Sequence, residues 1–560
     1  MATLLLATHV SCKSSAPIVA EEEQMESSTP TVAEEEQVDM PPVEFVFVDY
    51  FKAFEERFYP PELATDDNGF RDFIRLFGMS GYEISARTGD DVKSHRRQIY
   101  EKLGLDPDIP LVLRFPFCAD RAVNIFYMER GERMPLVRFG LPWTLEDFPM
   151  LADWVNEIDE PLDAIAEAIR KPVFFAPKSQ SPDSVEPDKP LCLLSWFLME
   201  AQMYRSIART FQARAVFRIG QGNIDGAIDD KLTILRFSRH ITRSGSVVSH
   251  LVGIAIEDMA MAIPVGANPE YPLTERQIRR ILEGIDALPP MTPISDALEG
   301  DRLVKLSQVQ EFFIAYAQGG EAFAKKWAEW ELGEPPTIRH PLNWDIAYRR
   351  INEAFDALQE PPPHERLHAL IEESEEMLSD VECVDQLSLI PGGIEMVLSD
   401  YAIASLIRGM PDIIEEAIHR SQCLENMQRL VLAMMLYRLE RGRMPDGNWV
   451  MQIAPYLGRN AERYFSCQTN PSPRGRTTYA LVNYGNNVPS SHETILLVEL
   501  SEPVPFNRAV ISPDEVLALF RDRERNLPHP GGMNTARQSG AVMFIMQSIN
   551  EAELRRLLGR

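Results

Sequence analysis

The sequence lacks a long apolar run. No uninterrupted stretch reaches the roughly 18 residues that a membrane-spanning helix needs, and the best candidate, 191–199, stops at Glu200. Basic residues are also in deficit, since 84 Asp and Glu outnumber 56 Lys and Arg and give a formal net charge of −28. Nucleic-acid-binding proteins need a basic footprint, so this balance excludes nucleic acid as a partner. It equally disfavours non-specific adhesion to anionic lipid.

Cysteine is scarce, and its spacing carries no signature. No C-x-x-C pair occurs, so neither a zinc knuckle nor a thioredoxin-type redox site is encoded. We expect most of the cysteines to be small buried apolar residues. The sequence leaves open whether a disulfide forms among the last three. The six are Cys12, Cys118, Cys192, Cys383, Cys423 and Cys467.

Catalytic motifs are almost absent, with no G-x-S-x-G, P-loop or G-x-G-x-x-G. The one match is H-E-x-x-H at 364–368. On a helix, His364 and His368 would share one face and could both bind Zn²⁺. Glu365 could then polarise a metal-bound water, as in a zinc-dependent metallopeptidase.

Three observations count against this metallopeptidase. Arg366 stands between the two histidines, and the prolines at 361–363 place His364 at the start of a helix instead of inside one. No third ligand is specified by a continuation of the motif. We interpret Glu365 as a first-turn charge favoured by the helix dipole and both histidines as surface residues. The metallopeptidase remains the alternative function.

The first twelve residues resemble the end of a bacterial lipoprotein signal. A short apolar run stops at a small residue before Cys12, which would carry the lipid. No basic stretch precedes the run, and His9 stands where Leu is usual. The alternative is a frayed N-terminus of a cytoplasmic protein. Residues 13–42 contain a duplicated acidic segment that cannot bury a core, so they are predicted to be a disordered linker.

The length of 560 residues predicts two to four domains. We expect a multidomain α+β protein with an α+β domain at 43–187, a helical domain at 188–410 and an α+β domain at 411–560. A helix pair near 205–240 resembles a tetratricopeptide unit but does not recur at that period. Apolar periodicity predicts further helices in the helical domain and at its edge: 247–261, 274–287, 295–317, 344–358, 364–380 and 394–421.

The C-terminal part carries the strand signals. Residues 476–482 and 494–500 are β-branched and aromatic runs bounded by Gly, Pro and Asn, and they predict strands. The run Thr494–Val498 is almost wholly apolar, which is typical of a strand buried on both faces. Residues 543–545 predict one more strand after a glycine-rich turn.

The segments 465–467, 479–480, 494–499 and 504–506 and the turn at His529 follow one another in a characteristic order. In this order and spacing, residues 430–547 resemble the pilin-like domain named for its H-x9-D-G motif, common in planctomycete-type bacteria. The helical domain is similar to uncharacterised planctomycete proteins with no assigned activity. Ser539 stands where the pilin-like family has Asp, so a role that needs this carboxylate is not carried over. We interpret the motif residues as shaping a hairpin turn: His529, Gly531, Gly532, Ser539 and Gly540.

The pilin-like resemblance implies one long helix packed on a small antiparallel sheet. The helix would span 412–441 and cover the sheet with a stripe at i, i+3, i+4 and i+7: Leu432, Met435, Leu436 and Leu439. The resemblance and the scarcity of catalytic motifs favour a non-catalytic structural or interaction protein of the cell envelope or a periplasm-like compartment. We expect protein partners, no cofactor, and membrane attachment through a lipid on Cys12. The alternative location is the cytoplasm.

Overall fold

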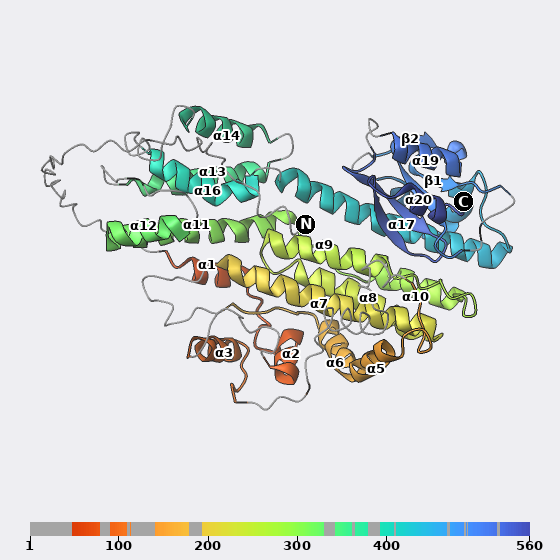
Figure 1. Cartoon of the computed structure of the whole chain (residues 1–560), viewed down its shortest axis with the longest axis horizontal. Coiled ribbons are helices and arrows are strands. Elements are labelled where there is room, and N and C mark those ends of the chain that lie inside the picture. Colours follow the sequence, from red (N-terminus) through yellow and green to blue (C-terminus); the bar gives the residue numbers. More distant parts are fainter. Residues whose placement is uncertain are drawn as a thin grey trace, which may run out of the picture. The chain divides into compact units, whose positions relative to one another are not determined.

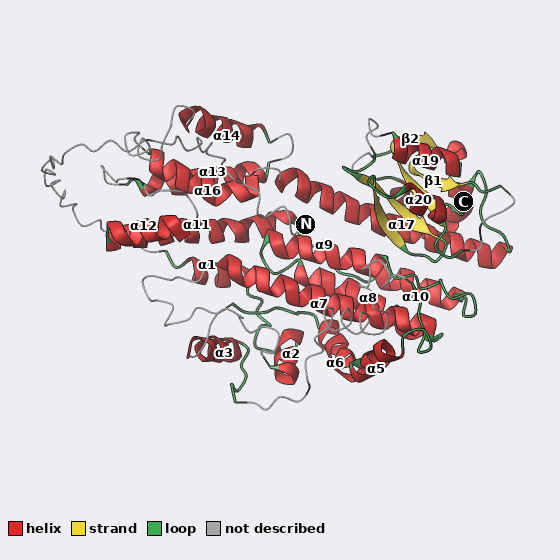
Figure 2. Cartoon of the chain, viewed as in Figure 1, coloured by secondary structure: helices red, strands yellow, loops and turns green. Residues whose placement is uncertain are grey.

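Helices dominate the chain, and strands occur only near its C-terminus in the residues that the structure describes (Figure 2). The structure is a computed structural model. It describes residues 48–78, 90–108, 113, 141–178, 193–329, 336, 342–360, 364–378, 392–407, 410–467, 471–485, 489, 491–522 and 527–560. The expected linker at 13–42 and Cys12 lie outside these residues. Among the described helices, none combines the length and apolarity needed to cross a membrane.

The first helices of the described chain begin and end at residues that cap them. Helix α2 begins after Asn68, whose side chain accepts a hydrogen bond from Phe70 N, and it ends at Gly78, which has a φ of 63°. Its buried phenylalanines pack against α6. The helices of this part are α1 Tyr50–Phe58, α2 Gly69–Phe77, α3 Asp90–Lys102, α5 Pro149–Glu157 and α6 Asp159–Arg170.

The central helices confirm the periodicity analysis at 247–261, 274–287, 295–317, 344–358 and 364–380, with ends within two residues (Figure 1). The single helix expected at 394–421 was wrong, because this range is divided between α16 and α17. Asn223 caps α8 by accepting a hydrogen bond from Gly226 N. Helices α7, α8 and α9 contact one another and share one apolar core. The central helices are α7 Leu193–Gly220, α8 Ile224–Ile241, α9 Val247–Met261, α10 Glu275–Asp286, α11 Ile294–Gln318, α12 Gly320–Glu329, α13 Trp344–Leu358, α14 Glu365–Leu378 and α16 Gly393–Ile407.

The longest helix of the described chain, α17 (Met410–Arg441), leads into the C-terminal sheet. Gly442 ends it with a φ of 70°. The elements that follow are α18 Trp449–Ile453, η3 Ala454–Leu457, η4 Ala461–Phe465, β1 Arg476–Val482, β2 Ile495–Pro505, η5 Phe506–Arg508, β3 Val510–Ile511, α19 Pro513–Arg521, β4 Gly532–Arg537, β5 Val542–Met546 and α20 Glu551–Leu557.

The sheet has the strand order β3-β1-β2-β4-β5. Strands β1, β2, β4 and β5 pair antiparallel, whereas β3 runs parallel to β1, with Leu481 opposite Val510. The expectation of a purely antiparallel sheet was therefore wrong. After β2, the chain passes through the short helix η5 and returns along β1. There Leu481 N of β1 donates a hydrogen bond to Ala509 O, just before β3.

The two faces of the sheet have different covers. Helix α17 contacts β2, β4 and β5 on one face, where Tyr479 and Leu497 join the large apolar core. On the other face, Ala480 and Val498 pack with residues of α19 and α20. This arrangement confirms that β2 is buried on both faces over Ile495–Val498.

The apolar stripe expected on α17 is only partly right. Leu432 and Leu436 are buried, but Leu439, in the last turn, is 52% exposed. In contrast, every residue from Leu430 to Met434 is fully buried. The physical reason is that α17 also packs against α9 and α10, so its middle is covered on several sides while its C-terminal end is not.

Candidate metal centre

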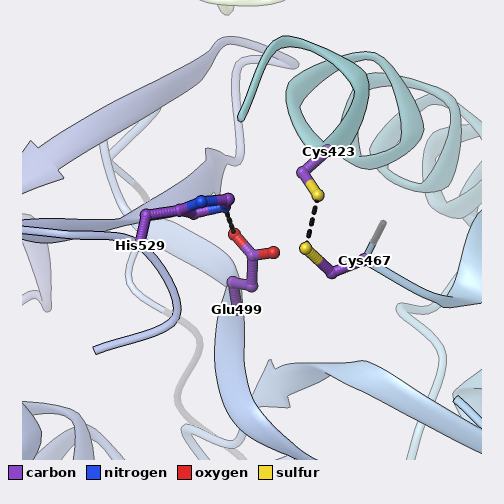
Figure 3. A group of neighbouring side chains, drawn as sticks. All are labelled: Cys423, Cys467, Glu499 and His529. Carbon is purple, nitrogen blue, oxygen red and sulfur yellow. Dashed lines mark hydrogen bonds and ion pairs between the residues drawn. The ribbon is translucent and has the colours of Figure 1, made fainter. Parts of the chain in front are cut away.

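Four side chains that can bind a metal ion meet between α17 and the sheet (Figure 3). Cys423 comes from α17, Cys467 follows η4, Glu499 lies on β2, and His529 lies in the turn before β4. One ligand atom from each lies within 4.8 Å of the corresponding atoms of all the others. All four residues are buried, and none is more than 2% exposed. The cluster is therefore closed to solvent.

Strand geometry explains why Glu499 points into this cluster. Side chains alternate along a strand, so Glu499 lies opposite in direction to Val498, which packs on the α19–α20 side. Glu499 is paired in register with Tyr479 of β1, whose ring belongs to the core beneath α17. Glu499 is thus a fully buried carboxylate on the face of the sheet that lies beneath α17.

The glycine turn places His529 at the same spot. His529 O accepts a hydrogen bond from Gly532 N over 3.1 Å, and Gly531 supplies the positive φ of 78° that closes the turn. A β-carbon on Gly532 would lie 2.3 Å from Ile545 O, so only glycine allows this close approach of β4 to β5. The turn therefore positions a buried imidazole as well as reversing the chain.

A hydrogen bond on one side and an ion-pair contact on the other orient the imidazole. His529 Nε2 lies 3.0 Å from Glu499 Oε2, which also accepts a bond of 2.9 Å from Asn534 Nδ2. On the other side, His529 Nδ1 lies 2.7 Å from Glu416 Oε1 of α17. A carboxylate on the second ring nitrogen is the usual partner of a metal-binding histidine, because it fixes the ring and raises its basicity.

The two sulfur atoms complete the cluster. Cys423 Sγ and Cys467 Sγ lie 2.7 Å apart, and the structure has both residues as cysteines outside any disulfide. Cys467 is held by its backbone N–H, which donates to Thr478 Oγ1 over 2.7 Å. Figure 3 shows the Glu499 carboxylate between the imidazole and the sulfur atoms. The question left open by the sequence about Cys423 is answered in part: its neighbour is Cys467, while Cys383 lies outside the described residues.

The electrostatics of the cluster favour a cation. Burial raises the pKa of Glu499, although His529 opposes this shift. Burial lowers the pKa of His529, but hydrogen bonds with Cys467, Glu416 and Glu499 outweigh burial and raise it. Burial and the nearby Cys423 and Glu499 raise the pKa of the Tyr479 hydroxyl well above its usual range. Glu499, the two thiols and the Tyr479 hydroxyl are thus acidic groups around a single basic residue, His529, in a buried site.

The donor set fits zinc. Two thiolates, one imidazole and one carboxylate provide four ligands of the types that Zn²⁺ binds in tetrahedral sites. Glu499 Oε1 is a buried carboxylate oxygen that accepts no bond from an N–H or O–H group of the described residues, and the Cys467 thiol is its neighbour. Bound there, a zinc ion would supply positive charge and cross-links, and a closed site of this kind is structural.

The H-E-x-x-H residues lie elsewhere and do not form such a group in the part of the chain that is described. His364 precedes α14 and has a positive φ of 53°, and its Nδ1 lies 3.4 Å from Ala357 O. Glu365 and His368 are exposed. The sequence interpretation of both histidines as surface residues at a helix start agrees with this placement, although His364 is half-buried.

Only His529 of the motif residues reaches the cluster. Ser539 O instead accepts a bond from Gly266 N, and Gly540 O accepts one from Gln428, so this second turn contacts the helical part. Sequence reasoning did not identify Cys423, Cys467 or Glu499 as ligands. One signal was available for Glu499, a single carboxylate inside a predicted strand and directly after its apolar run Thr494–Val498.

Comparison of the chain with models of known protein families, with curated proteins and with solved structures found no match.

Proposed function

We propose that this chain is a non-catalytic structural or interaction protein whose C-terminal sheet is fastened to α17 by a structural zinc ion. The ligands are Cys423, Cys467, Glu499 and His529. The observation that carries the proposal is the meeting of these four donors, from four separate elements, within 4.8 Å of one another. Glu416 and Asn534 are the positioning residues for the imidazole and the carboxylate.

Burial of the ligands supports a structural role over a catalytic one. A catalytic zinc keeps a coordination position open to substrate, whereas a structural zinc has four protein ligands and no access. Here the four donors are at most 2% exposed. A substrate would have to open the packing between α17 and the sheet before it reached the ion.

The ion would join parts of the chain that are distant in sequence. It would connect α17, the segment after η4, the middle of β2 and the turn before β4. Because α17 also packs against α9 and α10, a cross-link at Cys423 holds the sheet on the same helix that contacts the helical part. Cys12 lies outside the described residues, so membrane attachment and an envelope location stay predictions from the sequence.

The experiment is a metal analysis of the purified, reduced full-length chain. After incubation with zinc and removal of excess, we expect one tightly bound zinc per chain. Cobalt in its place should give the intense visible bands of a four-coordinate thiolate site. The double variant Cys423→Ser/Cys467→Ser should lose the metal, and Glu499→Gln should weaken its binding.

The matched control is the double variant His364→Ala/His368→Ala, which should keep the full zinc content. Absence of zinc from the reduced wild-type chain would contradict the proposal without any variant having to fold. Metal retained by the cysteine variant but lost from the histidine control would transfer the site to the H-E-x-x-H motif and support the metallopeptidase alternative.

A further inference from the structure

The two cysteines of the cluster are close enough to form a covalent bond with each other. Cys423 Sγ and Cys467 Sγ are 2.7 Å apart. They are separated by 44 residues in the chain. Cys423 lies on α17, Cys467 follows η4, and α17 and η4 are in contact. A covalent bond between these sulfur atoms would therefore join elements that are already packed together.

We propose that the centre is redox-sensitive: a two-electron oxidant such as hydrogen peroxide converts the zinc-bound cysteine pair into a Cys423–Cys467 disulfide and expels the zinc. This inference rests on the proposed zinc site and names its regulation. The two states exclude each other, because a disulfide sulfur has lost the thiolate charge that binds the ion.

The reaction balances with peroxide as the only co-reactant. One thiolate attacks a peroxide oxygen, the O–O bond breaks, and a sulfenic acid and a water form after protonation. The second thiolate attacks that sulfur, the S–O bond breaks, and a second water leaves. Overall, two thiolate sulfurs lose two electrons and form one S–S bond. Peroxide takes these two electrons and two protons to give two waters. The zinc dissociates as Zn²⁺, and the side chains of Glu499 and His529 are chemically unchanged.

The surroundings make disulfide formation the favoured outcome of oxidation. A thiolate that is converted to sulfenic acid here has its resolving partner in contact, so the intermediate is consumed before a second peroxide reaches it. The backbone bond from Cys467 N to Thr478 Oγ1 is 2.7 Å long and keeps the Cys467 segment against β1 during the reaction. The new cross-link would retain the attachment between α17 and this segment after the ion has left.

The test uses the zinc-loaded full-length protein. Hydrogen peroxide is added in the presence of a chromogenic zinc chelator, and zinc release is followed by absorbance. In parallel, samples are trapped with a thiol-blocking reagent, digested without reduction and mapped by mass spectrometry. We expect zinc release and the Cys423–Cys467 peptide pair to appear at the same rate and to the same final extent. Dithiothreitol followed by zinc should restore the starting state.

The matched control changes the other four cysteines to serine (Cys12→Ser, Cys118→Ser, Cys192→Ser and Cys383→Ser). It should respond like the wild type, because the reacting pair is intact. Zinc release accompanied by sulfinic acid or by a different disulfide would overturn the inference, as would a zinc-loaded protein that peroxide leaves unchanged. In both cases the zinc site itself would stand. A reduced protein that forms the disulfide but never binds zinc would instead refute the proposed function, and this inference with it.

Discussion

Gln428 connects the helical part of the chain to the turn that contains Gly540, and substituting it tests the packing of α17. Gln428 is fully buried in α17. Its Oε1 accepts a bond of 3.1 Å from Lys231 Nζ of α8, and its Nε2 donates a bond of 2.7 Å to Gly540 O. Lys231 is also fully buried and donates to Ala260 O at the end of α9. One side chain thus joins α8, α17 and the turn.

Gln428→Leu keeps the volume and removes both bonds. A buried hydrogen bond to a charged group contributes about 1.5–3 kcal/mol, and a neutral one about 0.5–1.5 kcal/mol, so we expect a loss of about 2–4 kcal/mol. Lys231→Met should remove the same charged bond from the other side. In a double-mutant cycle, the double variant should therefore be less destabilised than the sum of the two single variants, by about 1.5–3 kcal/mol at pH 6.

The pH dependence has a definite sign. Burial lowers the pKa of Lys231 to about 7, below its unfolded value of 10.5. Between these two values the unfolded chain binds the proton and the folded chain does not, so this lysine's contribution to stability rises with pH. Relative to Lys231→Met, the stability of the wild type should rise by up to about 1.4 kcal/mol per pH unit between pH 7 and pH 10.5, with the slope from this residue fading below and above that window. The coupling to Gln428 should shrink as the lysine becomes neutral.

The assay is urea-induced unfolding of the full-length chain at pH 6 and pH 9. Far-UV circular dichroism and tryptophan fluorescence must give coincident transitions before free energies are extracted. Gln221→Leu, the same substitution at an exposed position, is the control and should change stability by less than about 0.5 kcal/mol. Additive single-variant effects at pH 6 would show that Lys231 and Gln428 do not interact and would refute this account of the contact.

Two further predictions test packing and charge burial. A β-carbon at Gly300 would lie 1.7 Å from a backbone oxygen of the loop before α9, so Gly300→Ala should destabilise the fold by about 1–3 kcal/mol or more. Gly320 has open space around it, so Gly320→Ala should not destabilise the fold. Thermal unfolding measures both variants, and equal effects would contradict the close approach at Gly300. Arg214 forms a buried ion pair of 2.6 Å with Asp230, so Arg214→Met should lower the free energy of unfolding in urea by about 3–5 kcal/mol. The ion pair of Arg276 lies at the surface, so Arg276→Ala should lower it by at most about 1 kcal/mol. Similar losses in the two variants would show that burial does not decide the effect.

Local chemistry along the chain was enough to predict most elements. The caps at Asn68 and Asn223 and the stop at Gly78 are interactions between residues close in sequence, and they set the ends of α2 and α8. The helices at 247–261 and 344–358 match their predicted bounds because apolar periodicity reports directly which side of a helix is buried. The strand β1 likewise follows from a β-branched run between turn residues.

Strand β4 was not predicted, for a reason that also bears on the site. Its sequence, 532–537, is polar and includes Asn534 and Thr535, yet both are fully buried because partners elsewhere satisfy them. Asn534 donates to Glu499, and Thr535 donates to Met543 O. A polar strand becomes stable in a core only when its partners are present, and those partners belong to other strands.

The sequence by itself determined where most helices begin and end, that the strand containing Thr494–Val498 is buried on both faces, and that His529 lies in a glycine turn. Only the tertiary structure decided that this histidine meets Cys423, Cys467 and Glu499, because the four residues are spread over more than a hundred positions with no characteristic spacing. Periodicity reports how much of a side chain is buried, but it does not report which distant side chain lies beside it. That neighbour is set by how α17 lies across the sheet, and it is this packing that turns four scattered polar residues into one closed donor set.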